Sequence, residues 1–174
     1  LPYLRAPALH RDAWAERLGP KTRPRIGLVW SGGNLHYKGQ GHRSIPLEQF
    51  QVLLTQDIEF HCLQKQILES DRAVLSGLPI QTWTADLHDF AETAALISHM
   101  DLVISVDTAV AHLTGAMGQA VWVLLPFDPD MRWMLHREDT PWYPHVMRLF
   151  RQPSLADWAP PLAAAREEMR HLIC

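Results

Sequence analysis

The sequence has few cysteines and no surplus of positive charge. Its 174 residues include only two cysteines, Cys62 and the last residue, Cys174. No disulfide framework is therefore expected, and a reducing compartment, the cytoplasm, suits the chain best. Lysine and arginine number 16, against 19 aspartates and glutamates. This balance argues against a nucleic-acid partner, because an extended phosphate-binding surface needs a basic face.

Long apolar runs and leader-like segments are also missing. No stretch approaches the ~20 apolar residues that span a bilayer, and no signal peptide is visible. The chain opens with Leu1 rather than Met, and residues 1–24 hold four prolines. We expect a piece of a longer protein, in which residues 1–24 form a tether with a short helix over 12–18, capped by Asp12. A complete small protein is the alternative. Residues 25–174 are predicted to form one domain.

Several catalytic signatures are absent as well. Neither the G-x-G-x-x-G dinucleotide fingerprint nor the G-x-x-x-x-G-K-[ST] phosphate loop occurs. A G-x-S-x-G nucleophile elbow is missing, so a hydrolase triad has no support. The 10 histidines are scattered, without an H-E-x-x-H motif. Asp128-Pro129-Asp130 is more typical of a turn than of a metal site. We therefore expect neither a metal nor a bound cofactor.

Short apolar runs alternate with helical patterns through the rest of the chain. Strands are predicted over residues 26–30, 58–63, 80–83, 102–106, 120–125 and 146–150. Helices are predicted to begin near Pro46 and to cover 69–78, 90–99 with Asp89 as N-cap, 108–117 and 158–172. Such alternation favours right-handed crossovers and a parallel sheet with helices on both faces. The predicted fold is a Rossmann-like α/β domain, whose ligands bind beyond the carboxyl ends of the strands.

The sharpest candidate site lies where the fourth strand ends and a helix begins, at Asp107 and Thr108. A helix start offers free backbone N–H groups and a partial positive charge, which suit a phosphate. Thr108 adds a hydroxyl, Ala109 lets the helix approach the sheet closely, and His112 follows one turn later on the same face. The equally weighted alternative is that Asp107 only caps the helix and His112 packs inside the protein.

The ends of the first two strands carry further candidates. After the first strand, glycine backbone can approach an anion and offer its amides, with an ordinary tight turn as the alternative; the residues are Ser31, Gly32, Gly33 and Asn34. Arg43, at the mouth of the next helix, could complement phosphate charge. Lys65, at the end of the second strand, reaches either a phosphate or sugar hydroxyl, or solvent. The aromatic tract with Trp133, Trp142 and Tyr143 is interpreted as a lid or interface, or as closing the bottom of the sheet.

Taken together, these motifs resemble a known family. Residues 101–116, D-L-V-I-S-V-D-T-A-V-A-H-L-T-G-A, look like the nucleotide-sugar signature of glycosyltransferase family 9, the bacterial heptosyltransferases. Residues 25–150 are similar to the C-terminal glycosyltransferase domain of bacterial tetratricopeptide-repeat proteins. The shared motifs are G-L-V-W-S-G, R-S-I-P, L-Q-K, D-F-A-x-T-A-A-L-I, S-V-D-T-A-V-A-H-L, P-W-Y-P and R-L-F-R-Q.

The resemblance implies a GT-B glycosyltransferase, built from two Rossmann-like halves, with this chain as the C-terminal half that holds a nucleotide-sugar donor. The sugar would pass to a hydroxyl of an acceptor glycan or protein without a metal. By position, Asp107, Thr108 and His112 would contact the donor. Arg43 stands where the family has a lysine, and residues 64–66, Q-K-Q, stand where it has an acidic residue.

The same resemblance implies partners outside this sequence. The general base is expected on the N-terminal half of the enzyme, and tetratricopeptide repeats are expected in the full-length chain. The alternative is a degenerate GT-B-like module that binds a protein or a glycan without catalysis.

Overall fold

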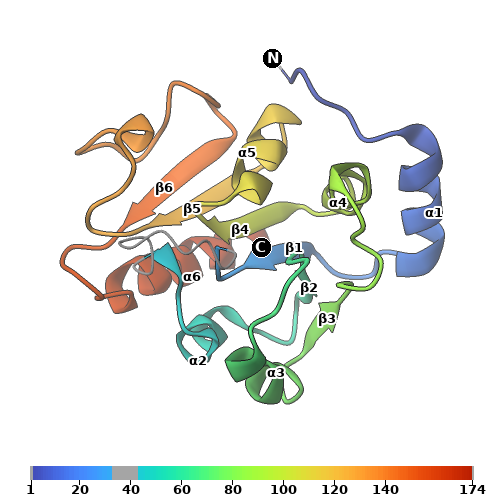
Figure 1. Cartoon of the computed structure of the whole chain (residues 1–174), viewed down its shortest axis with the longest axis horizontal. Helices are drawn as coiled ribbons and strands as arrows, with labels where there is room; N and C mark the ends of the chain where they lie inside the picture. Colours follow the sequence, from blue (N-terminus) through green and yellow to red (C-terminus); the bar gives the residue numbers. More distant parts are fainter. Residues whose placement is uncertain (1, 33–42, 174) are drawn as a thin grey trace.

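Six parallel strands form one sheet in the order β3-β2-β1-β4-β5-β6. The computed structural model describes residues 2–32 and 43–173. The strands are β1 (Arg25–Val29), β2 (Glu59–Cys62), β3 (Ile80–Thr82), β4 (Leu102–Val106), β5 (Val121–Leu125) and β6 (Met147–Arg151). The chain runs outward from β1 to β3, then returns to the other side of β1 and runs outward again from β4 to β6 (Figure 1). The predicted Rossmann-like fold is confirmed, and its switch point lies between β1 and β4.

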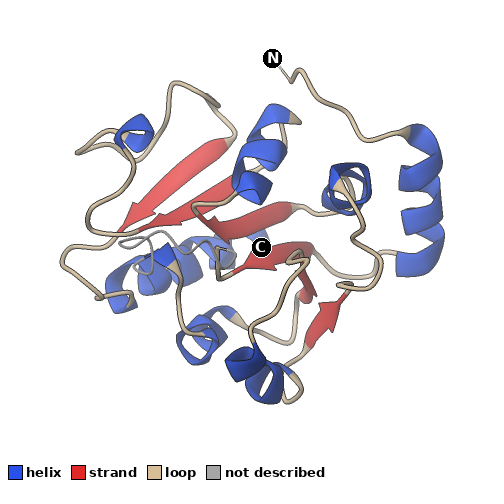
Figure 2. Ribbon diagram, viewed as in Figure 1, coloured by secondary structure: helices blue, strands red, loops and turns tan. Residues whose placement is uncertain are grey.

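Helices cover both faces of this sheet (Figure 2). One face carries α1 (Ala8–Leu18), α4 (Phe90–Ile97) and α5 (Ala109–Ala116). The other carries α2 (Leu47–Phe50) with the 3-10 turn η2 (Gln51–Leu53), then α3 (Glu69–Leu75) and α6 (Ala159–Ile173). All residues of β1 and β4 are buried, as expected for central strands covered on both faces. None of the described helices combines the length and apolar composition that a membrane crossing requires.

Helix starts were predicted with mixed success. Asp89 caps α4 as expected, since its carboxylate accepts from the backbone N–H groups of Ala91 at 2.8 Å and Glu92 at 3.0 Å. The start of the first helix was predicted wrongly. Helix α1 begins at Ala8, directly after Pro7, and Asp12 lies within it. Proline before the first turn opens a helix without a side-chain cap, because the amide it lacks has no helical partner there.

Residues 8–18 pack against the domain. Trp14 is 1% exposed, and its Nε1 donates to Glu92 Oε2 at 2.7 Å. Its ring also lies edge-on to Trp83, with the ring centroids 5.2 Å apart. The Arg25 side chain donates to the backbone oxygens of Leu18 and Gly19, which fixes the turn after α1. This helix is therefore part of the packed structure, and the division of the chain at residue 24 stays a prediction.

The crossover from β5 to β6 contains only the 3-10 turn η3 (Met131–Trp133). Trp133 is fully buried in the cluster of apolar side chains on the α5 face. Further along, Leu149 in β6 donates its amide to Glu138 O at 2.7 Å, so the crossover also runs beside the edge strand. Trp133 and Tyr143 of this tract therefore pack on the α5 face, whereas Trp142 is exposed. The crossover contributes to the carboxyl edge of the sheet.

Candidate functional site

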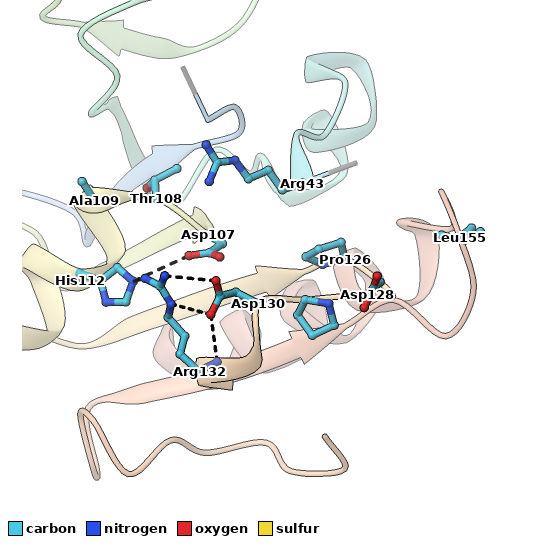
Figure 3. Close-up of a pocket in the computed structure, with 11 residues that line it drawn as sticks. Arg43, Asp107, Thr108, Ala109, His112, Pro126, Asp128, Asp130, Arg132 and Leu155 are labelled. Atoms are coloured by element: carbon cyan, nitrogen blue, oxygen red, sulfur yellow. Dashed lines mark hydrogen bonds and ion pairs between the residues drawn. The ribbon is translucent and has the colours of Figure 1, made fainter. Parts of the chain in front are cut away.

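A cavity of about 660 Å³ opens at the carboxyl ends of β4 and β5 (Figure 3). The turn into α5 forms one wall with Asp107, Thr108 and Ala109. The beginning of the β5–β6 crossover forms the opposite wall with Pro126, Asp128, Pro129, Asp130 and Arg132. Arg43, His112 and Leu155 complete the lining. Five of the candidate residues named from the sequence meet here: Arg43, Asp107, Thr108, Ala109 and His112.

The start of α5 presents backbone N–H groups to this cavity. The first helical bonds run from the amides of Ala111 and His112 to Thr108 O. The amides of Ala109 and Val110 precede these bonds, and helix starts leave such groups without intrahelical partners. Thr108 is the N-cap residue with an extended backbone, and its hydroxyl lies 3.0 Å from Ser105 Oγ instead of capping the helix. Electrostatically, this helix end favours an anion.

Arg43 reaches the same cavity from the mouth of α2. Its guanidinium lies across Gly32, where a β-carbon would come within 2.5 Å of Arg43 Nε. A side chain at Gly32 would therefore displace the Arg43 guanidinium from its present position. Because Arg43 and the start of α5 line one cavity from different elements, an anion between them would meet a fixed cation and a helix dipole together.

A second cavity, of about 390 Å³, lies on the other side of the α5 start. It shares Thr108 and Ala109 with the first cavity and adds residues from the ends of β1 and β2 and the start of α4. Ser31 and Lys65 belong to its lining, together with the half-exposed ring of Phe90. Lys65 Nζ donates to His88 O at 2.6 Å, and the residue is exposed to solvent.

The loop after β1 differs from the expected anion cradle in its described part. The amide of Ser31 donates to Gln64 Oε1 at 3.0 Å, and the amide of Gly32 lies 3.3 Å from Ser44 Oγ. Both amides are thus engaged within the chain. Gly33 and Asn34, the other two predicted residues of this loop, lie outside the described residues. Anion binding by this loop stays a prediction.

His112 is held on several sides. Its ring stacks on Trp133, with centroids 5.1 Å apart and planes 20° apart. Its Nδ1 lies 3.2 Å from the Tyr143 hydroxyl, and its Nε2 lies 3.4 Å from Arg132 Nη1 and 3.8 Å from Asp107 Oδ1. Burial lowers the pKa of His112; Asp107 acts in the opposite direction and Arg132 adds to the lowering. His112 therefore both packs against the crossover and faces the cavity.

The pKa values of Asp130 and Tyr143, which lie close to His112, are also shifted. Asp130 accepts from Arg132 Nε at 2.8 Å and from Arg132 Nη2 at 3.2 Å, and these hydrogen bonds hold the pKa of the carboxyl below its usual range. Burial and a hydrogen bond with the side chain of Tyr3 raise the pKa of Tyr143 to about 12. The Arg132 guanidinium is thus already paired, and the Tyr143 hydroxyl stays protonated throughout the ordinary pH range.

Asp130 and Arg132 were not predicted to bind the donor. The rule that ligands bind beyond strand ends pointed to the residues directly after β5. No local pattern indicated that Arg132, in the irregular crossover, lies next to the His112 ring. Asp130 belongs to the D-x-D match, but its carboxylate is engaged by Arg132. Within residues 2–32 and 43–173, no group of three His, Cys, Asp or Glu side chains is arranged to hold a metal ion.

Three comparisons relate the chain to known proteins. Residues 56–124 match the model of glycosyltransferase family 9 (heptosyltransferase). The chain is 30% identical over 167 residues to Protein FlbA of Caulobacter vibrioides, an alignment that covers 92% of this chain and 27% of FlbA. The chain thus spans little more than a quarter of that relative. Its fold matches E. coli ADP-heptose LPS heptosyltransferase II with a TM-score of 0.66 and 15% identity, over 99% of this chain and 53% of that one.

Proposed function

Because the chain contains a glycosyltransferase family 9-like domain, we propose that it is the C-terminal, donor-binding half of a GT-B enzyme that transfers a sugar from a nucleotide sugar to an acceptor hydroxyl. The observation that carries this proposal is the start of α5, which lies between two cavities and contributes Thr108 and Ala109 to both. A nucleotide sugar has a pyrophosphate in its middle and a different group at each end. Its shape therefore matches this arrangement.

The pyrophosphate is assigned to the start of α5. The amides of Ala109 and Val110 precede the first helical bond, and the positive end of the helix dipole lies beside them. Arg43 faces this turn from another element and supplies a full positive charge. Arginine binds phosphate oxygens with two parallel hydrogen bonds, so it can replace the lysine of the family with a different geometry.

The two ends of the donor are assigned by the chemistry of the cavity walls. The smaller cavity has the aromatic and aliphatic side chains of Phe90 and Leu87 in its lining, which suit the flat face of a nucleobase. The larger cavity has Asp107, Asp128 and Asp130, whose carboxylates accept hydrogen bonds from sugar hydroxyls. The nucleoside therefore belongs in the smaller cavity and the sugar in the larger one.

The reaction follows from this placement. The oxygen of the acceptor hydroxyl attacks the anomeric carbon, and the bond from that carbon to the diphosphate oxygen breaks. The hydroxyl proton passes to a base, which we expect on the N-terminal half of the enzyme. Negative charge grows on the leaving nucleoside diphosphate, where the α5 N–H groups, the Thr108 hydroxyl and Arg43 would stabilise it.

One observation favours a second candidate, a degenerate module that binds a protein or a glycan without catalysis. The residue after β2 at which the family has a carboxylate is here within Q-K-Q. The side chain of Gln64 is buried and bonded to the amides of Trp30 and Ser31, so it holds the loop after β1 rather than facing a ligand. A donor site without that carboxylate has fewer hydrogen-bond acceptors for the hydroxyls of a ribose.

Nucleotide binding distinguishes the two candidates. The thermal midpoint of the 174-residue chain is measured with ADP, GDP and UDP in parallel; ADP comes first because the structural neighbour is named for ADP-heptose. A nucleotide present at a hundredfold excess over its Kd stabilises the folded state by about 2.7 kcal/mol. Replacing Arg43 with Gln should weaken this binding about tenfold, the equivalent of one charge-assisted hydrogen bond of about 1.4 kcal/mol.

Arg137→Gln is the matched control for this variant. Arg137 carries the same charge and pairs with Asp139, but it is absent from the lining of both cavities. Nucleotide affinity should therefore be unchanged in this variant. If none of the three nucleotides shifts the midpoint of the folded chain at millimolar concentration, the donor-binding proposal fails and the degenerate module replaces it.

A further inference from the structure

The hydrogen-bonding neighbours of His112 favour one position for its ring proton. A guanidinium group can only donate, so the contact of 3.4 Å between Arg132 Nη1 and His112 Nε2 requires a lone pair on Nε2. A neutral imidazole without a proton on Nε2 carries it on Nδ1. That nitrogen lies 3.2 Å from the Tyr143 hydroxyl oxygen, which can accept the proton. The two neighbours therefore select the same tautomer.

We infer that Arg132 and Tyr143 are positioning residues that hold His112 as a neutral imidazole with its proton on Nδ1, so that Nε2 accepts a hydrogen bond from a hydroxyl of the donor sugar. The inference rests on the proposed function and assigns the donor contact of His112 to the sugar instead of the phosphates. A lone pair repels a phosphate oxygen and attracts an O–H group. An unprotonated Nε2 therefore suits the larger cavity, to which the sugar is assigned, better than the phosphate position at the start of α5.

A sugar hydroxyl can take the place of Arg132 as the donor to His112 Nε2. The Arg132 to Nε2 distance is long for an N–H···N bond, and Arg132 is held by two shorter bonds to Asp130. A sugar hydroxyl entering the larger cavity can thus replace the weaker contact without breaking the Asp130–Arg132 pair. The ring itself cannot turn freely, because Trp133 covers one face at a centroid distance of 5.1 Å.

The charged groups around the ring favour the neutral form on balance. From the crossover, Arg132 faces Nε2 and opposes a second positive charge, while its partner Asp130 acts in the other direction. From the turn before α5, Asp107 lies 3.8 Å from Nε2 and also favours the cation. The Tyr143 hydroxyl on the remaining side stays neutral. Burial of the ring adds to the effect of Arg132, and the pKa of His112 is lowered as a result.

Nuclear magnetic resonance of the free 174-residue chain tests the tautomer directly. Nitrogen-15 shifts of the His112 ring distinguish a protonated from an unprotonated nitrogen, and a pH titration gives the pKa. We expect a protonated Nδ1, an unprotonated Nε2 and a pKa below the ordinary value of 6.5. Arg132→Gln should raise the pKa of His112, and Tyr143→Phe should move proton population from Nδ1 to Nε2. Asp130→Asn, which keeps Arg132 but removes the opposing carboxylate, should lower the pKa further.

Arg137→Gln again serves as the control, because its pair with Asp139 on the same tract does not touch His112. A His112 that is cationic at neutral pH, that carries its proton on Nε2, or that titrates identically in Arg132→Gln and the parent chain would overturn the inference. These measurements need no nucleotide, so their outcome is independent of whether the proposed function holds.

Binding then tests the role assigned to Nε2. The probes are the nucleoside diphosphate that binds best and the matching nucleotide–glucose. His112→Ala should lower the affinity for the nucleotide–glucose about tenfold more than that for the diphosphate alone, the loss expected for one hydrogen bond. Equal losses for both probes would place His112 at the phosphates and contradict the hydroxyl role. Failure of every nucleotide to bind would refute the proposed function and this role with it, while the tautomer result would stand.

Discussion

Two histidines, His61 and His112, both have a pKa lowered by loss of solvent around the ring, although His61 is fully buried and His112 only partly. Their surroundings give them different roles. His61 lies in β2, is 1% exposed and is absent from the lining of the two cavities at the carboxyl edge. Its Nδ1 accepts from Trp83 Nε1 at 3.2 Å, and its ring stacks on that tryptophan. His112 instead lines a cavity between charged groups. A lowered pKa thus reports burial, and only the surroundings indicate a site.

The largest expected effect concerns the pH dependence of stability at His61. Burial lowers the pKa of His61 to about 4, so the unfolded chain takes up a proton at higher pH than the folded chain. Stability from this residue is complete above the ordinary pKa and falls as the pH drops from 6.5 toward 4, by on the order of 3 kcal/mol. His61→Asn keeps an acceptor for Trp83 Nε1 and should flatten this slope in urea unfolding measured at successive pH values.

His112→Asn is the comparison for that experiment. The ring of His112 is less buried and its surroundings include carboxylates, so removing it should change the slope less than His61→Asn does. An unchanged slope in His61→Asn, or a larger change in His112→Asn, would reverse the assignment of the structural and the functional histidine.

Gly115→Ala should have the next largest effect on stability, because it displaces Tyr143, a neighbour of His112. A β-carbon at Gly115 would come within 2.6 Å of Tyr143 Cγ, so the Tyr143 ring must shift. We expect a loss of about 1–3 kcal/mol in unfolding free energy, as for other overpacked sites, together with a change in the ring resonances of His112. Gly77→Ala is the matched control, because its β-carbon would meet only Val74 O at 3.6 Å. Equal behaviour of the two variants would show that Tyr143 tolerates displacement.

The smallest expected effect on stability is that of His112→Ala. Its ring touches Trp133 and Tyr143 but borders an open cavity, so water can fill the space. We expect a loss of about 1 kcal/mol in urea unfolding, clearly less than the loss from His61→Ala, which empties a closed site beside Trp83. A greater loss from His112→Ala than from His61→Ala would mean that His112 is mainly a packing residue.

The sequence predicted those parts of the fold and site that depend on neighbours in the chain. The strand at 102–106 matches β4, and Asp89 caps α4, because apolar periodicity and capping are local properties. The turn at Asp107 and Thr108 follows from the same local signals and the rule for strand ends. Whether these residues bind a donor stays a prediction, which the nucleotide-binding measurements test.

The remaining site residues depend on contacts that no local pattern encodes. Arg132, Trp133 and Tyr143 reach His112 from an irregular crossover without a periodic signal. Even the alternatives weighed for Asp107 and His112 missed this arrangement, since Asp107 lies beside the imidazole and His112 is both packed and open to the cavity. The start of α1 was misplaced for a related reason, because Pro7 opens that helix while Asp12 only resembles a cap.

The contact between Tyr3 and Tyr143 joins residues 2–7 to the carboxyl edge of the sheet. Tyr3 and Leu4 donate their amides to Ala116 O at the far end of α5, and the Tyr3 side chain bonds to the tyrosine that holds His112. Tyr143 therefore lies between the first residues of the chain and the imidazole, and a change at Tyr3 should be detected in the ring resonances of His112. Among the described residues, no hydrogen bond from α6 reaches that ring, so His112 is linked to the segment before α1 and not to the last helix.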